Sequence, residues 1–395
     1  MKRLILVSIL GFSFLLTKTS YSQVKVNGWL QSSLYAWENL NEDKQWDYYQ
    51  GLQLRIAHEQ YSDLYFNTFL REAYRGDPQE WKERVYNLYV NWKFYRNYKL
   101  RVGRQFLYRG VINGTMDAGV LTGKVARNLL VSAVVGTEAP YERTFKVRQW
   151  DDGNVLGGYL AYNLPWENSI NVSYFQKQRE SDLYWQQVGS ALDGFLFEKL
   201  NYYARFDYNI LSSYYQAMRY RLTYYETKWS LGVEFHSQRP RVYEDSYFNI
   251  FEIEAFSQIR SAGTYRFGNY EVGLQYLYTQ YEDDNDNRVI GSIGHNKYGT
   301  LGIIYQNGYG GENIGYYADI RYEIIPNLTA RLFNSYYNYE RAYTNISEDA
   351  LAFSAGLKYR LKNILILDGE LQQSSNTYYK NDLRGLLRLT YLFNI

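Results

Sequence analysis

Strict alternation of apolar and other residues is the feature of this 395-residue chain that most constrains its fold. From Leu351 to Leu361, an apolar residue occupies every second position, and small or polar residues fill most of the positions between. The same two-residue period recurs at Leu52–Ile56 and at Met218–Tyr224. Successive side chains of a strand point to opposite faces, so this period predicts β-strands with one apolar and one polar face.

The alternating segments follow one another through the whole chain, separated in turn by short and by longer connections. Arg127-Asn128 and Lys362-Asn363 are short, whereas Ala139–Asp152 is long. Tight turns at one end and long loops at the other are typical of an up-and-down outer-membrane barrel. We count about 20 strands, with 18 and 22 as the alternatives, because bacterial single-chain barrels have an even number. The segment Arg288–Gly311 fits either one long loop or an extra hairpin.

Alternation alone does not distinguish a membrane barrel from a soluble β-sandwich, whose polar face would point outward. In hydrocarbon every backbone polar group must be hydrogen-bonded within the protein, so a spanning sheet has to close on itself. The chain holds 46 Tyr, and aromatic residues make up 19% of it. Tyr suits a membrane interface because its ring is apolar and its hydroxyl is polar. We therefore predict an all-β protein, a single transmembrane up-and-down antiparallel β-barrel.

The N-terminal segment has the pattern of a secretory signal. Lys2 and Arg3 precede the apolar run Leu4–Leu16, and Ser20 and Ser22 supply small residues for cleavage before residue 23. The predicted organisation is a signal peptide at residues 1–22 and a barrel at residues 23–395. Together, a secretory signal and a membrane barrel place the protein in the outer membrane of a Gram-negative cell.

Several classes of function are excluded by composition. Without Cys, the chain has no disulfide and no thiolate metal site, and without the cations of its signal it is almost neutral, which argues against nucleic-acid binding.

The sequence was also searched for catalytic and metal-binding patterns. Among the three His, His58-Glu59 and His236-Ser237 are strand neighbours whose side chains point to opposite faces, so neither pair can form a catalytic dyad. The run Glu282–Asn287 offers oxygen ligands but lacks the Gly and distal Glu of a Ca²⁺ hand, which favours a solvated loop. We expect no catalytic residues, no metal and no cofactor.

A family resemblance rests on the segment Leu100–Val120. It holds Gly103-Arg104-Gln105, then Asp117-Ala118-Gly119-Val120, and resembles the Gly-Arg-Gln strand and the Asp-Gly-Val return of porin-like barrels, most of all the alginate-export family. His295-Asn296-Lys297-Tyr298-Gly299, followed by Gly308–Asn313, is similar to that family's His-Lys-aromatic-Gly loop. Ala118 interrupts the Asp-Gly pair, and the family's intervening Trp is missing. The resemblance implies a monomeric channel for a hydrophilic, often anionic solute, without fixing alginate as that solute.

The final residues predict a strand that runs to the end of the sequence. Apolar residues stand at every second position from Leu387 to Ile395, with Tyr391 and Phe393 between them. This pattern is similar to the C-terminal signal that the barrel-insertion machinery recognises, although the last residue is Ile rather than an aromatic one. The expected partners are therefore outer-membrane lipid, the insertion machinery and a hydrophilic solute.

If the apolar face points outward, the inward face can be read from the sequence. The predicted pore-lining and constriction residues are Arg101, Arg104, Gln105, Arg219, Arg221, Arg321, Arg331, Lys358 and Arg360. Strict alternation would put Arg104 outward, so we expect a bulge after Gly103 to turn it toward a constriction at the base of a loop Tyr108–Met116. The alternative is a ladder of cross-strand ion pairs. A transport surface requires several unpaired cations grouped at a constriction.

The predicted function is diffusion or export of hydrophilic solutes, including anionic ones and saccharides. The alternative is a structural or adhesive surface barrel whose lumen is plugged by loops and ion pairs. Inward positions held by Gly103, Gly232, Gly273 and Gly356 favour an open lumen, because a plugged lumen would be filled with bulkier side chains.

Overall fold

The fold is described from a computed structural model, which covers residues 24–38, 43–61, 63–239, 255–282, 284–340, 346–377 and 381–395. The predicted signal peptide lies outside these residues. The described chain forms 22 strands: β1 (Val24–Glu38), β2 (Lys44–His58), β3 (Leu64–Arg75), β4 (Glu80–Tyr95), β5 (Tyr98–Arg109), β6 (Ile112–Ala126), β7 (Leu129–Glu138), β8 (Asn154–Asn163), β9 (Ser169–Arg179), β10 (Asp182–Leu196), β11 (Leu200–Asn209), β12 (Tyr214–Tyr225), β13 (Trp229–Gln238), β14 (Phe256–Phe267), β15 (Tyr270–Gln280), β16 (Asn285–His295), β17 (Gly299–Gly308), β18 (Asn313–Ile325), β19 (Leu328–Glu340), β20 (Ser347–Leu361), β21 (Leu365–Ser375) and β22 (Asp382–Asn394).

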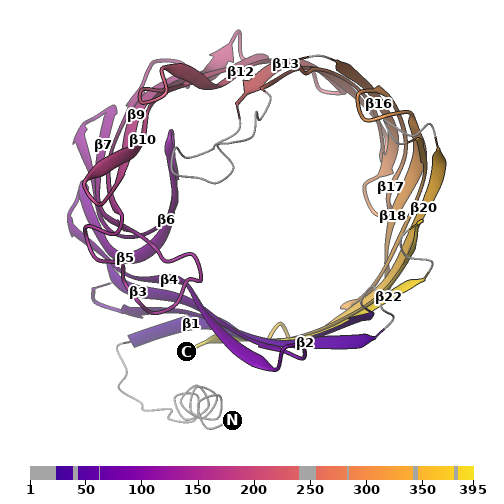
Figure 1. Ribbon diagram of the computed structural model, residues 1–395, viewed down its shortest axis with the longest axis horizontal. Helices are drawn as coiled ribbons and strands as arrows, with labels where there is room; N and C mark the ends of the chain where they lie inside the picture. Colours follow the sequence, from indigo (N-terminus) through magenta and orange to yellow (C-terminus); the bar gives the residue numbers. More distant parts are fainter. Residues whose placement is uncertain are drawn as a thin grey trace.

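The sheet closes into a ring. Each strand pairs antiparallel with its neighbours along the chain, and β1 pairs with β22, with Leu34 opposite Leu387. Figure 1 shows the ring from one end. The predicted all-β up-and-down barrel is confirmed, with the largest of the three strand counts considered. Among the described residues, no helix is long and apolar enough to cross a membrane.

The extra pair of strands comes from the segment that the sequence left open. Residues 288–311 belong to the hairpin β16–β17 rather than to one long loop. Strand β16 begins at Asn285, so the last three residues of the acidic run Glu282–Asn287, which we expected to be a solvated loop, belong to the strand. Asp286 is buried in the sheet, and its carboxylate accepts a hydrogen bond of 2.9 Å from Nε2 of Gln306. The side-chain oxygen of Asp286 is thus used within the barrel wall.

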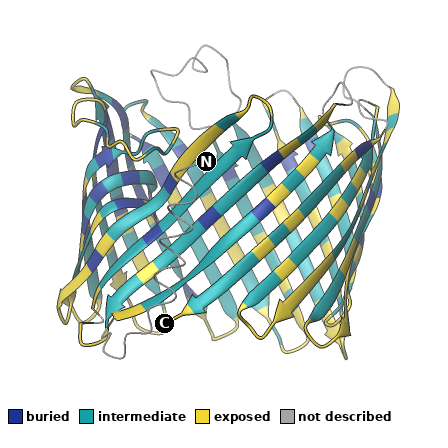
Figure 2. Ribbon diagram, turned by 90° about the horizontal axis from the view of Figure 1, so that it is seen from below, coloured by how far each residue is buried: buried dark blue, intermediate teal, exposed yellow. Residues whose placement is uncertain are grey.

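The outer face of the ring exposes large apolar side chains along its strands. Figure 2 shows the tilted strands from the side, with exposed residues recurring along each of them. The exposed apolar residues of the wall include Val102, Leu121, Leu231, Leu274, Ile303, Leu332, Leu371 and Leu387. A soluble protein would not leave such a surface in water, whereas hydrocarbon requires it.

Aromatic rings gather at the end of the barrel that carries the tight turns. Ring contacts run from β14 to β18 through Tyr265, Phe267, Tyr270, His295, Tyr298 and Tyr322, with centroids 4.6–6.3 Å apart. His295 and Tyr298 thus belong to an aromatic girdle at a tight turn, where Nδ1 of His295 accepts a hydrogen bond from the backbone N–H of Lys297. Girdles of this kind mark the interfaces of membrane barrels. The loop expected from His295–Gly299 is a turn in this structure.

One hairpin leaves the wall and enters the ring. The β4–β5 ladder ends at Leu88 opposite Arg104, and the β6–β7 ladder begins only at Met116. Beyond these points, β5 and β6 form a ladder only with each other. Figure 1 shows β6 inside the ring. The departure begins at Gly103, whose φ is +123° and where a Cβ atom would lie 2.2 Å from the carbonyl oxygen of Leu88. Only glycine accommodates this turn.

The loop after β7 bridges the part of the wall that the hairpin leaves. In this loop, the backbone carbonyl of Arg143 accepts a hydrogen bond of 2.7 Å from the backbone N–H of Val85 on β4. At its start, the N–H of Ala139 donates to the carbonyl of Thr115 on β6 at 3.0 Å. The loop therefore supplies a hydrogen-bond partner to one backbone group of β4 and to one of β6, next to the point where the hairpin leaves the wall.

The hairpin packs on the inner wall through the buried apolar cluster of the barrel. Val111, Ile112 and Met116 of the hairpin are each 1% exposed, and the cluster includes Val155 on β8 and Phe175 on β9. Burying an aliphatic side chain of this size stabilises a fold by about 1.5–3 kcal/mol. The hairpin is consequently a fixed part of the inner wall.

Candidate functional site

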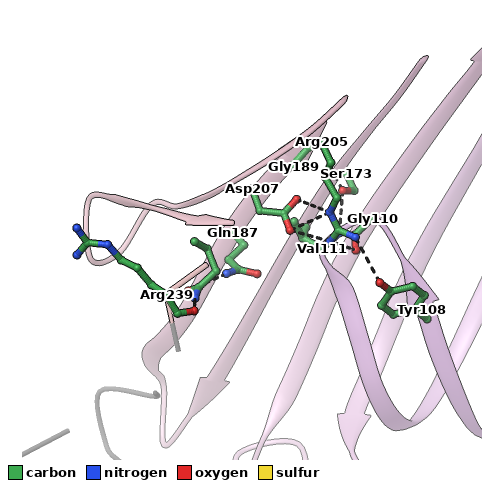
Figure 3. Close-up of polar contacts among 10 residues, drawn as sticks. Tyr108, Gly110, Val111, Ser173, Gln187, Gly189, Arg205, Asp207 and Arg239 are labelled. Atoms are coloured by element: carbon green, nitrogen blue, oxygen red, sulfur yellow. Dashed lines mark hydrogen bonds and ion pairs between the residues drawn. The ribbon is translucent and has the colours of Figure 1, made fainter. Parts of the chain in front are cut away.

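The tip of the hairpin is fastened to strands β9, β10 and β11 by polar contacts (Figure 3). The backbone N–H of Val111 donates to Oγ of Ser173 at 3.0 Å. Nη2 of Arg205 donates to the carbonyl of Gly110 at 3.0 Å and pairs with Asp207 at 2.7 Å. Asp207 is 1% exposed, and Arg205 is the cation that lies against its buried carboxylate. The pair holds the carbonyl of Gly110 in place.

The wall leaves room for the tip at Gly189 on β10. A Cβ atom there would lie 2.5 Å from Cγ1 of Val111 and 2.6 Å from Oδ1 of Asp207. A side chain at this position would therefore collide with both the apolar and the polar fastening of the hairpin. These contacts also identify the inner face of the wall, since the hairpin inside the ring rests on Ser173, Gly189 and Arg205.

A pocket of about 290 Å³ lies between the hairpin and the wall that supports it. We call it the basic pocket, and its lining consists of Lys99, Arg101, Phe106, Leu107, Tyr108, Arg109, Val120 and Thr122. Lys99 and Arg101 stand two residues apart on one face of β5, about 7 Å along the strand. Arg109 folds back from the end of β5, and its Nη1 donates to the hydroxyls of Thr122 and Ser132 at 3.2 and 2.7 Å.

The three cations of the basic pocket have only neutral partners among the described residues. Nη1 of Arg101 reaches Oε1 of Gln105 at 3.4 Å, and its guanidinium lies over the ring of Tyr89 at 4.8 Å. Its Nε atom is buried and has no hydrogen-bond acceptor in the described chain. Neither Lys99, Arg101 nor Arg109 forms an ion pair with a described carboxylate.

Six other arginines of the inner face are paired with carboxylates. The pairs are Arg205–Asp207, Arg219–Glu234, Arg266–Glu271, Arg331–Asp319, Arg384–Asp382 and Arg388–Asp368, at N–O distances between 2.5 and 3.9 Å. Much of the lumen is therefore lined by the ion-pair ladder that the sequence left as the alternative. The basic pocket differs from it because three neighbouring cations there share no acid.

Arg104 and Gln105 lie at the base of the hairpin, but neither side chain faces the open lumen. Arg104 is 4% exposed and pairs bidentately with Asp117 at 2.7 Å for each contact. It also donates to the carbonyls of Thr144 and Lys146, and so ties the loop after β7 to the hairpin. The ladder has no register shift at Gly103, so the expected bulge is replaced by a glycine kink. Gln105 is 1% exposed and donates to the carbonyl of Ala118 at 3.0 Å.

The other predicted lining residues share the inner face with Arg205 and the basic pocket. Arg219 is held by Glu234, Arg331 by Asp319, and Arg221 makes a contact of 3.5 Å with Oδ1 of Asn201. Three further predicted cations are exposed on the inner face without an ion pair to a described residue: Arg321, Lys358 and Arg360. They lie on β18 and β20, across the ring from β5 in Figure 1.

Lys99 and Arg109 are site residues that the sequence reasoning missed. Both are an even number of residues away from Arg101 on β5. Strict alternation would therefore have put Lys99 on the inner face together with Arg101. Arg109 fell in the segment expected as a loop, and its return toward Thr122 depends on the kink at Gly103. In the described chain, no group of three or more His, Asp or Glu residues is arranged to hold a metal ion.

Comparison with known proteins bears on the fold. No family model matches the chain, and no curated protein matches it. The translocation pore of the P pilus usher PapC is similar in structure, with a TM-score of 0.54 and 8% identity over 94% of this chain and 100% of that one. For OccAB4 of Acinetobacter baumannii, the TM-score is 0.49 and the identity is 11%, over 94% of this chain and 98% of that one. For a BenF-like porin of Pseudomonas fluorescens Pf-5, the TM-score is 0.45 and the identity is 9%, over 94% of this chain and 99% of that one. At such identities the likeness to the usher pore concerns the barrel fold alone.

Proposed function

We propose that this protein is an outer-membrane channel of the porin type, which passes hydrophilic solutes and favours anions. The observation that carries the proposal is the contrast between the two faces of the closed wall. The outer face exposes apolar side chains between aromatic rings, and the inner face carries exposed charged residues such as Arg321 and Lys358. Only a barrel with lipid outside and water inside satisfies both faces.

The number of strands supports an aqueous lumen. Barrels of about 8 strands are filled by their own side chains, whereas 16–18 strands already leave a water-filled channel. A ring of 22 strands is wider still, so wide that a separate plug is needed to close it. The one element that the described chain inserts into it is the hairpin β5–β6. This hairpin narrows the lumen on one side, next to the basic pocket, and the basic pocket is therefore the proposed constriction.

The preference for anions rests on the charges at that constriction. Lys99, Arg101 and Arg109 present three positive charges without a carboxylate partner in the described chain. An approaching anion is attracted and a cation repelled, as at other rings of basic residues that pass anions. The resemblance to the alginate-export family supports a monomeric channel for such solutes. The C-terminal pattern of alternating apolar residues supports insertion by the barrel-assembly machinery of the outer membrane.

Liposome swelling tests the channel directly. The refolded protein should make dextran-loaded liposomes swell in isosmotic solutions of a monosaccharide, because solute entry through an open lumen draws in water. Swelling should be slower for a trisaccharide, since the hairpin narrows the lumen. Heat-denatured protein in the same liposomes is the control. Liposomes that hold the folded barrel but do not swell would favour the plugged structural barrel instead.

A further inference from the structure

The outer face of the wall has a hollow of about 580 Å³ between β5 and β9, on the left of the ring in Figure 1. The side chains at its sides are large, apolar and exposed to the outside: Leu121, Val135 and Leu156. Its floor consists of small residues: Gly119, Ala133 and Gly158. We propose that this space, which we call the outer hollow, binds one acyl chain of a membrane lipid. The proposal goes beyond the proposed function, because it requires only that the outer face meets lipid.

Side chains of the protein do not fill the outer hollow. A Cβ atom on Gly158 would meet nothing within 4 Å, and a Cβ atom on Gly119 would meet only the carbonyl oxygen of Val135, at 3.9 Å. Neither glycine has a positive φ, so the backbone does not require glycine at either position. Glycine weakens a strand, and inside a strand it often marks a place where a ligand approaches the backbone. The two glycines therefore give the outer hollow its depth for a molecule from outside the chain.

The surroundings of the outer hollow determine what can fill it. It lies on the face that exposes Val102 on β5 and Leu160 on β8, and hydrocarbon covers such a face in a membrane. An apolar hollow offers water no hydrogen-bond partner, so a hydrocarbon chain is the molecule that suits it. Its volume lies within the range of sites that bind a single small molecule, and we therefore assign it one acyl chain.

Polar groups stand at one end of the outer hollow. Tyr174 lines the hollow, and its hydroxyl donates to Oε1 of Gln176 and accepts a hydrogen bond of 2.7 Å from Nε2 of Gln186. The two glutamines are opposite each other on β9 and β10, and both are half-buried on the outer face. In the described chain, the side-chain N–H groups of Gln176 and the Oε1 atom of Gln186 have no partner. The carbonyl oxygen of an ester-linked or amide-linked acyl chain can accept a hydrogen bond from Gln176.

The order of these groups gives the direction of the chain. Gly158 is opposite Tyr174, and Gln176 lies two residues further along β9, on the same face. Beyond it, β9 ends beside the long loop after β7, where the N–H of Glu180 donates to the carbonyl of Asp151 at 2.7 Å. Long loops of membrane barrels are extracellular. The lipid therefore belongs to the outer leaflet, with its linkage at Gln176 and its chain over Gly158.

Native mass spectrometry of the refolded full chain, released from detergent micelles, tests this inference with three probes. Palmitoyl lysophosphatidylcholine has one chain with an ester carbonyl, hexadecyl lysophosphatidylcholine has a chain of the same length with an ether oxygen, and glycerophosphocholine has no chain. We expect one molecule of the ester lipid to remain bound to each barrel. The ether lipid should bind about tenfold more weakly, because it has no carbonyl oxygen for Gln176. Glycerophosphocholine should not be retained.

Two substitutions separate the chain of the lipid from its linkage. Ala133→Leu fills the floor of the outer hollow and should weaken binding of both lipids about tenfold or more, because the chain loses its contact with the floor. Gln176→Leu should weaken binding of the ester lipid to the level of the ether lipid and leave binding of the ether lipid unchanged. Ala355→Leu is the matched control and should change neither affinity, since Ala355 on β20 is opposite the exposed Leu332 and Leu371 of the outer face. The heat-dependent shift of the barrel on a detergent gel verifies that each variant is folded.

The opposite results are equally distinct. Retention of several lipids per barrel that Ala133→Leu does not change would mean an unspecific lipid shell and overturns the inference. Equal retention of the ester and ether lipids contradicts the place of the linkage at Gln176. Paired barrels in the mass spectrum that Ala133→Leu separates would show that a second copy of the chain, rather than a lipid, covers the outer hollow. A protein that conducts ions but retains no lipid overturns this inference and leaves the proposed function intact.

Discussion

Replacing Lys99, Arg101 and Arg109 together by glutamine is expected to remove most of the channel's preference for anions. The three charges line one pocket beside the inserted hairpin and have no carboxylate partner among the described residues. At about 7 Å and an effective dielectric constant near 20, each charge changes the energy of a passing ion by about 2.4 kcal/mol. The anion-to-cation permeability ratio should therefore fall about tenfold or more. Reversal potentials across a salt gradient measure this ratio.

The matched control removes the same charge from the opposite side of the barrel. Arg321, Lys358 and Arg360 are also exposed on the inner face without an ion pair to a described residue, but they lie on β18 and β20, away from the hairpin. Their replacement by glutamine should lower the anion-to-cation permeability ratio much less. In a wide, water-filled lumen, dissolved salt screens a charge from ions that pass more than about a Debye length of 8–10 Å away. An equal fall for both triple variants would mean that the total charge of the lumen, rather than the basic pocket, sets selectivity.

The second large effect is expected from Gly189→Leu. Its side chain would collide with Val111 of the hairpin and with Asp207, which holds Arg205 on the carbonyl of Gly110. Overpacking of this kind costs about 1–3 kcal/mol, so the undocked fraction of the hairpin should rise about tenfold or more. An undocked hairpin no longer narrows the lumen at a fixed place. We expect a higher mean conductance, with current fluctuations that the unchanged protein lacks.

Gly158→Leu is the control for the same change of residue. Gly158 lies on β8, which is separated from β10 by β9, and a Cβ atom there would meet nothing within 4 Å. It is on the outer face, next to Leu156 and Leu160. A leucine there adds apolar surface facing lipid and should leave conductance unchanged. If Gly189→Leu inserts as a folded barrel with unchanged and steady conductance, the hairpin does not form the constriction.

The barrel was predictable because one face of every strand meets lipid. That requirement imposes alternation over the whole chain, as in Leu351–Leu361, whose apolar members lie on the outer face of β20. The strand number was harder to obtain, because a membrane strand of about ten residues gives a weak signal on its own. In β16, glycines at 291 and 294 and the acidic residues before it dilute the pattern, so a hairpin and a loop could not be told apart.

The candidate site depended on contacts that alternation does not contain. Alternation predicts which face of β5 carries Arg101, but it cannot show which cations have partners. Arg104 illustrates the limit. Its parity was outward, and its burial results from the loop after β7 and from Asp117, which becomes its cross-strand neighbour only in the folded hairpin. The position of Gly103 was the one local signal for the kink.

Single-channel recording of the refolded protein in planar bilayers tests the central claim most directly. A water-filled barrel with an unpaired basic constriction should give stepwise, ohmic currents in symmetric potassium chloride. Under a salt gradient, the reversal potential should have the sign of an anion-preferring pore, and this preference should weaken as the salt concentration rises, because screening increases. Barrels shown to be folded and inserted that carry no current, or that prefer cations, would contradict the proposal that this protein is an anion-preferring channel.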